Sequence, residues 1–189
     1  MSLVTENRLE GLSKIATGET GLPAKEMTMP NHLEQAPALQ VSQWFNTANP
    51  ITLDALHGQV VVVHAFQMLC PGCVTHGNPQ AVRIHEAFDR KDVVVLGLHT
   101  VFEHHAVMGP QALEVFIHEY RIPFPVAVDT AAIGSSVPLT MQAYGLRGTP
   151  SLVVIDRQGF IRLHHFGSLD DLQIGVLLGR LVSESANPT

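Results

Sequence analysis

One apolar run limits the folds open to this chain more than any other feature, and it extends from Gln59 to Phe66. The run is rich in valine and shows no alternation between apolar and polar residues. Such a pattern is typical of a central strand that helices cover on both faces. A second Val-rich run, Val93 to Leu98, follows a segment with helical spacing from Pro79 to Phe88. We therefore expect an α/β protein with a mixed central sheet and helices on both faces.

The rest of the chain supplies elements that flank this sheet. Leu39 to Trp44 and Ile51 to Leu53, on either side of an Asn49-Pro50 turn, predict an N-terminal antiparallel pair of strands. Periodicity and turn residues further predict helices over 111–120 and 139–144, a strand over 124–128, a hairpin over 151–166 and a last helix. The last helix would begin at a capping box, Ser168-Leu169-Asp170-Asp171, and bury Leu172, Val176, Leu177, Leu181 and Val182.

The length of 189 residues fits one domain with a segment to spare. Residues 1–37 hold scattered apolar residues and then several glycines and prolines, so we expect a partly irregular N-terminal arm before a domain over 38–189. Hydrophobic residues make up 46% of the chain and charged residues 15%, which provides a core and excludes general disorder. The low charged share also favours a surface covered by a second copy of the chain, as in a homodimer.

The charge and the apolar pattern exclude two classes of partner. The formal net charge is -6 and there is no long basic run, so a nucleic-acid backbone would be repelled. No strongly apolar stretch approaches the roughly 20 residues that a membrane span needs. The segment after Met1 lacks the basic start and apolar core of a secretory signal. The sequence therefore predicts a cytoplasmic protein with no nucleic-acid and no membrane partner.

The only two cysteines directly follow the central strand, in the motif Cys70-Pro71-Gly72-Cys73. At a helix N-terminus, unpaired N–H groups and the helix dipole favour the thiolate of the first cysteine. Cys70 is therefore the predicted nucleophile, and Cys73 is placed to resolve a mixed disulfide formed on it. Two other interpretations stay open. One is a pair of buried, inert cysteines, and the other is a non-catalytic metal-binding module that uses Cys70, Cys73 and His76, in a chain with 11 histidines.

From about Gln40 to Glu184 the chain resembles the thioredoxin-like thiol-disulfide oxidoreductases of the TlpA type, also called redoxins. The resemblance rests on the strand before the cysteines, the cysteine motif, the Gly148-Thr149-Pro150 loop, the following hairpin and the final helix. It implies a thioredoxin fold with an N-terminal β-hairpin extension and a central insert that starts at the Val101–Gln111 link. It also implies a protein or small-molecule disulfide as substrate, a thiol or a reductase as electron donor, and no organic cofactor.

The same resemblance implies roles for single residues. Pro150 would be a cis-proline that faces the cysteine pair, and Thr149 would offer backbone groups to an extended substrate. Pro71 and Gly72, between the cysteines, would complete the substrate surface. His64 occupies the position of a buried acid or amide that assists proton movement at the second cysteine. A histidine can do this near neutral pH, and a hydrogen-bonded core histidine is the alternative.

Two positions depart from the pattern of this family. Leu69 precedes the first cysteine, where tryptophan is common. Pro79 follows Cys73 by six residues, where five are usual. The extra residue predicts a distorted first helical turn around His76-Gly77-Asn78.

Peroxiredoxins share this fold, so peroxide reduction at Cys70 is the second hypothesis for the function. Their pattern requires a threonine three residues before the reactive cysteine and a proline seven residues before it. This chain has Gln67 and Val63 at those positions. Arg147 lies near the place of their activating arginine, but its spacing to Asp156 does not fit.

Overall fold

The computed structural model describes residues 34–184, so the predicted N-terminal arm lies almost entirely outside the described residues. A seven-stranded sheet has the order β1-β7-β6-β3-β4-β5-β2. Strands β3, β4 and β5 run parallel to one another, and the other neighbouring pairs are antiparallel. The strands are β1 (Glu34–Gln35), β2 (Val41–Phe45), β3 (Val60–Phe66), β4 (Val93–His99), β5 (Val126–Asp129), β6 (Ser151–Ile155) and β7 (Phe160–Phe166). The α-helices are α1 (Asn78–Ala87), α2 (Pro110–Glu119), α3 (Leu139–Ala143) and α4 (Asp171–Ser183).

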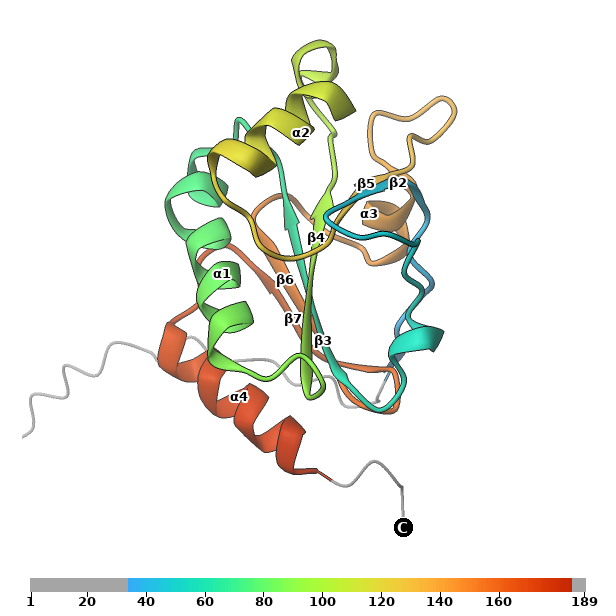
Figure 1. The fold of residues 1–189 in the computed structure, drawn as a ribbon. Helices are drawn as coiled ribbons and strands as arrows, with labels where there is room; N and C mark the ends of the chain where they lie inside the picture. The colour runs from blue at the N-terminus through green and yellow to red at the C-terminus, as the bar shows by residue number, and fades with distance from the viewer. Residues whose placement is uncertain (1–33, 185–189) are drawn as a thin grey trace, which may run out of the picture.

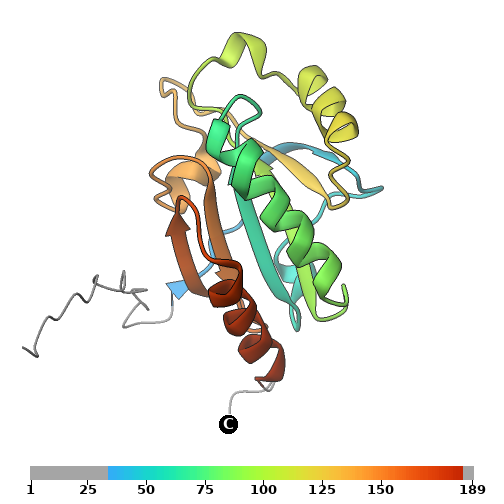
Figure 2. The same cartoon turned by 90° about the vertical axis from the view of Figure 1, so that its left-hand side faces the viewer.

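The predicted central strand is confirmed as β3, in which every residue is buried. Side chains alternate between the two faces of a strand, so β3 contributes to two cores. Val60, Val62 and Phe66 pack in the core under α1, α2 and α4, whereas Val61 and Val63 pack in the core under α3. Figures 1 and 2 show the resulting three layers, with α1 and α4 together on one face of the sheet. The mixed sheet with helices on both faces is therefore as predicted.

The predicted N-terminal hairpin is wrong in its pairing. Val41–Phe45 does form β2, but β2 pairs antiparallel with β5 at the outer edge of the sheet. Asn46 adopts a left-handed backbone conformation, with φ of 55°, and its amide Nδ2 donates to the carbonyls of Ile122 and Phe124. The chain is thereby turned away from the sheet before Ile51, and residues 51–53 lead into a short 3-10 helix, η1 (Asp54–Leu56). Pairing with β2 satisfies the backbone hydrogen-bonding groups along the edge of β5 that would otherwise be unpaired.

The last helix also differs in detail from its prediction. The side chain of Asp170 accepts hydrogen bonds from the backbone N–H groups of Leu172 and Gln173, so Asp170 is the cap. The buried face carries Ile174, Leu177, Leu178 and Leu181, while Leu172 and Val176 are exposed. The helix has two overlapping apolar stripes, and the sequence pattern alone does not show which of them meets the sheet.

The predicted central insert separates β4 from β5. It consists of residues 100–109, which contain the 3-10 turn η3 (His105–Val107), followed by α2 and the stretch that leads into β5. Figure 1 shows this insert at the end of the molecule where β3 and β4 finish. Among residues 34–184, none of the helices combines the length and the apolar character of a membrane span.

Candidate active site

The two cysteines lie just beyond the carboxyl end of β3. Cys70 is half-buried and Cys73 is fully buried, and both are free thiols. The backbone N–H of Cys73 donates to Sγ of Cys70 over 3.2 Å, and Sγ of Cys70 lies 3.5 Å from the carbonyl oxygen of Thr149. The first sulfur is thus within reach of another molecule, whereas the second lies beneath it.

The environment of Cys73 holds its proton. Burial raises the pKa of Cys73 to about 12, and a hydrogen bond with Cys70 adds to this increase. Hydrogen bonds from the backbone of Gln67 and from the side chain of Thr149 act in the opposite direction and are weaker. At neutral pH Cys73 is therefore a thiol, and it becomes a nucleophile only when its proton is removed.

The distorted first turn after the cysteines is confirmed. Residues Cys73–Gly77 form a single π-helical turn, η2, and regular α-helix begins at Asn78. A π turn takes up one more residue than an α turn, which accounts for the late position of Pro79. It also fixes which residue faces the sheet at this level of the helix, and that residue is Gly77.

Gly77 lies against two buried side chains. A Cβ atom at this position would lie 2.6 Å from Cε1 of His64 and 2.9 Å from Cβ of Pro150. Both distances are shorter than any real contact of a Cβ atom. The backbone of η2 therefore touches His64 and Pro150 directly, and a side chain at position 77 would push them apart.

The proline prediction is also confirmed, because the Thr149-Pro150 peptide bond is cis. Strand β6 pairs Ser151 with Ala65 of β3, so the preceding proline is level with the end of β3 and beside the cysteine loop. A Cβ atom at Gly72 would lie 3.3 Å from Cδ of Pro150. The structure thus brings together Gly72, Thr149 and Pro150 around Cys70, as the resemblance implied, and leaves Pro71 exposed next to them.

His64 is buried in β3, on the face of the sheet that η2 covers. Its Nε2 lies 2.7 Å from Oδ1 of Asn78, and its ring stacks on Phe66 with a centroid distance of 5.5 Å. Burial lowers the pKa of His64 to about 4, although the hydrogen bond with Asn78 acts in the opposite direction. The ring is therefore neutral at pH 7. Nothing in the sequence pointed to Asn78, whose own Nδ2 is buried without a partner among the described residues.

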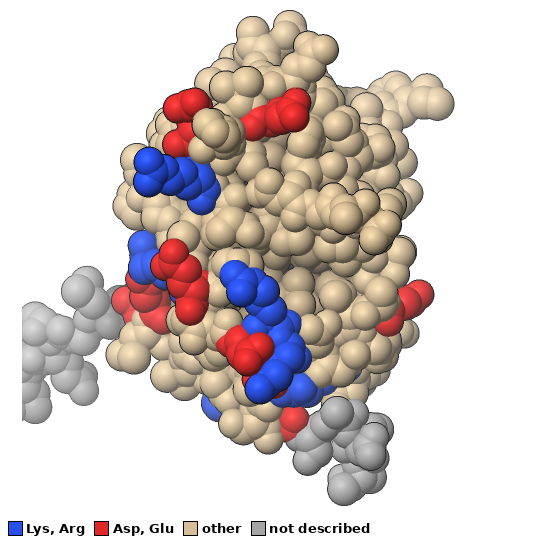
Figure 3. All heavy atoms as spheres, viewed as in Figure 1, with Lys and Arg blue, Asp and Glu red and all other residues tan. Residues whose placement is uncertain are grey.

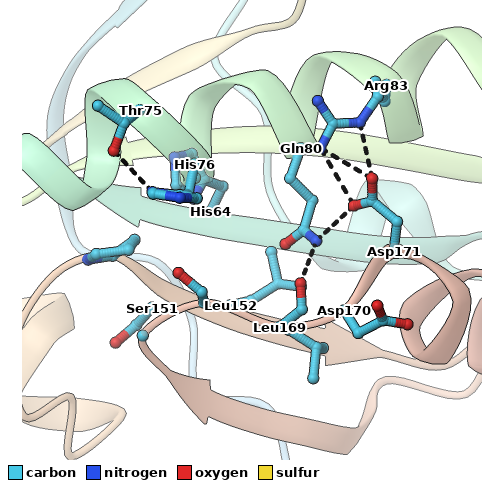
Figure 4. A pocket seen from close by; sticks show the side chains of 14 residues that line it. His64, Thr75, His76, Gln80, Arg83, Ser151, Leu152, Leu169, Asp170 and Asp171 are labelled. Atoms are coloured by element: carbon cyan, nitrogen blue, oxygen red, sulfur yellow. Dashed lines mark hydrogen bonds and ion pairs between the residues drawn. The ribbon is translucent and has the colours of Figure 1, made fainter.

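A pocket of about 260 Å³ opens beside His64. Figure 4 shows His64 near the helical turn that carries Thr75 and His76, with Gln80, Arg83 and Asp171 farther along the pocket. The exposed His76 bonds to the Thr75 hydroxyl through Nδ1, over 2.7 Å. Across residues 34–184 no group of three or more His, Cys, Asp or Glu side chains is arranged to hold a metal ion. The predicted alternative of a metal site at Cys70, Cys73 and His76 is therefore not formed.

A second hollow, here called the Cys70 groove, runs from Cys70 toward the insert and has a volume of about 440 Å³. Its lining residues are Leu69, Cys70, Pro71, Phe102, Glu103, His104, Val107 and Thr149. Gln67 joins its two sides: its carbonyl accepts from the N–H of Cys70, and its side-chain Oε1 accepts from the N–H of Phe102. No local sequence pattern indicates this role of Gln67, because its partner Phe102 lies in a distant loop.

Comparison with known proteins agrees with this geometry. The model of the AhpC/TSA family matches residues 33–164. The crystal structure of the thioredoxin-like superfamily protein SPOA0173 is 53% identical, covers 81% of this chain and 99% of its own, and has a TM-score of 0.79. A thiol-disulfide isomerase from Corynebacterium glutamicum is also 53% identical, with 79% and 98% covered and a TM-score of 0.76.

More distant structures share the fold alone. StoA from Bacillus subtilis is 19% identical, with 74% of this chain and 94% of its own covered and a TM-score of 0.56. No protein with a curated description matches the chain. The matched family model, the two structures at 53% identity, the cysteine motif and the cis-proline agree, and the chain therefore belongs to the AhpC/TSA family, as a redoxin of thioredoxin-like fold.

Proposed function

We propose that this protein is a thiol-disulfide oxidoreductase that exchanges the Cys70-Cys73 dithiol with a disulfide of another molecule. The observation that carries the proposal is the asymmetry of the pair: Cys70 is accessible beside the cis-proline, and Cys73 is buried with its N–H on Sγ of Cys70. An accessible nucleophile beside a protected second thiol is the arrangement that two-step exchange requires. The name of the isomerase from Corynebacterium glutamicum supports the same chemistry.

The exchange proceeds in two balanced steps. The Cys70 thiolate attacks one sulfur of the substrate disulfide, that S–S bond breaks, and the departing thiolate takes up a proton. Cys73 then loses its proton and attacks Sγ of Cys70. The second substrate sulfur leaves as a thiol, and the protein holds a disulfide between Cys70 and Cys73. The substrate has been reduced by two electrons, and a small thiol or a thiol reductase returns the pair to the dithiol.

His64 acts in this proposal as a positioning residue. Its described contacts go to Asn78, Phe66 and the backbone of Gly77, and they set the height of η2 above the sheet. The proton role that the resemblance implied for His64 stays a prediction. His64→Gln separates the two roles: a positioning residue alters the rate of exchange at every pH alike, whereas a proton carrier changes the pH profile of the second step.

Peroxide reduction at Cys70 is less well supported by the site. The threonine that peroxiredoxins need is replaced by Gln67, whose side chain is engaged by the backbone of Phe102. The Arg147 guanidinium lies 5.5 Å from the ring centroid of Phe166 and packs on that ring. The two groups that would activate a peroxide are thus absent or otherwise engaged.

Trapping of the intermediate tests the proposal. Cys73→Ser is expected to accumulate a mixed disulfide between Cys70 and a protein substrate, which mass spectrometry identifies by its bridged peptides. Cys70→Ser is the matched control and is expected to accumulate none. Equal turnover of a disulfide substrate by wild type and by Cys70→Ser would refute the assignment.

A further inference from the structure

The wall of the Cys70 groove that faces the cysteines comes from the β4–α2 link, residues 100–109. Two large apolar side chains from separate segments line the groove, Leu69 with 59% and Val107 with 60% of its surface exposed. The half-buried Phe102 lines the same groove. Exposed apolar side chains around a reactive sulfur indicate a contact surface rather than a solvated loop. This wall is contiguous with the exchange site, because Cys70 and Thr149 line the same groove.

The link is anchored by contacts at both of its ends. The N–H of Thr100 donates to the carbonyl of Phe66, and the hydroxyl of Thr100 donates to the carboxylate of Asp129. At the other end Met108 is buried in the core under α1, α2 and α4. The left-handed conformation of His104, with φ of 51°, makes the turn that presents Val107 to the groove. Anchored ends reduce the conformational entropy that the link loses when a substrate binds.

The Cys70 groove is lined by an acidic residue, Glu103, and by no Lys or Arg in the part of the chain that the structure describes. In Figure 3 the uppermost part of the face, over the β4–α2 link, shows no Lys or Arg either. A small acidic disulfide such as glutathione disulfide brings several carboxylates, and no Lys or Arg among the described residues 34–184 lines the groove to pair with them. A polypeptide whose cysteine is flanked by an apolar residue, and by neutral or basic residues, matches both the apolar wall and the carboxylate.

We propose that the β4–α2 link selects the substrate of Cys70, and that Val107 and Glu103 make it prefer an extended polypeptide disulfide with an apolar residue beside the cysteine. This proposed substrate preference rests on the proposed exchange function. Val107 supplies the apolar contact, and Glu103 disfavours acidic disulfides.

Two oxidants test the selection. One is a disulfide-linked dimer of a neutral tetrapeptide that has blocked ends and leucine beside its cysteine. The other is glutathione disulfide. The second-order rate constant for oxidation of the reduced protein is measured with each. Val107→Ser is expected to slow the peptide reaction about 3- to 10-fold and to leave the glutathione disulfide reaction unchanged. Glu103→Lys is expected to speed the glutathione disulfide reaction several-fold, with the gain shrinking as salt is added.

Matched controls lie on α2. Val115→Ser removes an equally exposed valine, with 61% of its surface exposed, and Glu114→Lys makes the same change of charge outside the groove. Both controls are expected to behave as wild type. The proposed substrate preference is refuted if Val107→Ser and Glu103→Lys change the peptide and glutathione disulfide rates alike, or change neither rate, while wild type still reacts with disulfides. If wild type reacts with neither disulfide, the proposed function itself is refuted.

Discussion

Substitution of Gly77 by alanine tests the contact between the π turn, His64 and Pro150. The added methyl would lie 2.6 Å from Cε1 of His64 and 2.9 Å from Cβ of Pro150. Neither neighbour can move easily, since the ring of His64 contacts Asn78 and Phe66, and Pro150 directly precedes β6, which is paired on both sides. Forcing a methyl group into a filled site costs roughly 1–3 kcal/mol. Alanine recovers up to about 1 kcal/mol through its greater helix propensity.

The net expectation for Gly77→Ala is a loss of about 1–2 kcal/mol in the free energy of unfolding, measured by urea titration of the reduced protein. Gly175→Ala is the control, because a Cβ there has no atom within 4 Å, and it is expected to gain about 0.5–1 kcal/mol. The double variant His64→Ala with Gly77→Ala should lose less than the sum of the two single changes, because the clash is gone. Equal gains in stability for Gly77→Ala and Gly175→Ala would refute the proposed contact.

Two further predictions concern stability. Burial lowers the pKa of His99 to about 4, and its two ring nitrogens have no partner among the described residues. The unfolded chain therefore binds a proton at this histidine more readily than the folded protein does. The free energy of unfolding is expected to fall as the pH falls from about 6.5 toward 4. His99→Leu is expected to flatten this pH dependence in urea titrations between pH 4 and 7, and an unchanged slope would contradict the reasoning. Asp170→Ala removes the N-terminal cap of α4 and is expected to lower the free energy of unfolding by about 1 kcal/mol, measured by thermal or urea unfolding. Ser168→Ala is expected to lower it by less. A larger loss for Ser168→Ala than for Asp170→Ala would show that Asp170 is not the cap.

The central sheet and the cysteine loop could be predicted because their signals are local. The valine run fixes β3, and the pattern around residues 151–166 fixes the hairpin of β6 and β7. The distorted turn also had a local signal, namely the one extra residue before Pro79. The cis form of Pro150 followed from the resemblance and not from the residues, because most bonds before proline are trans.

The errors and omissions involve partners that are distant in sequence. Strand β2 pairs Val41 with Asp129, and no pattern near Val41 indicates that partner. The bond between His64 and Asn78 depends on how the π turn lies over the sheet, and the Cys70 groove depends on where the link folds back. Such contacts are set by tertiary packing, which overrides local preference.

The most direct test of the central claim is a rapid-quench measurement of thiol loss from the fully reduced protein, with a protein disulfide and hydrogen peroxide compared as oxidants. We expect the disulfide to react much faster and the product to be an internal bridge between Cys70 and Cys73. Faster loss of thiols to peroxide, through a sulfenic acid on Cys70, would contradict it and make the protein a peroxidase.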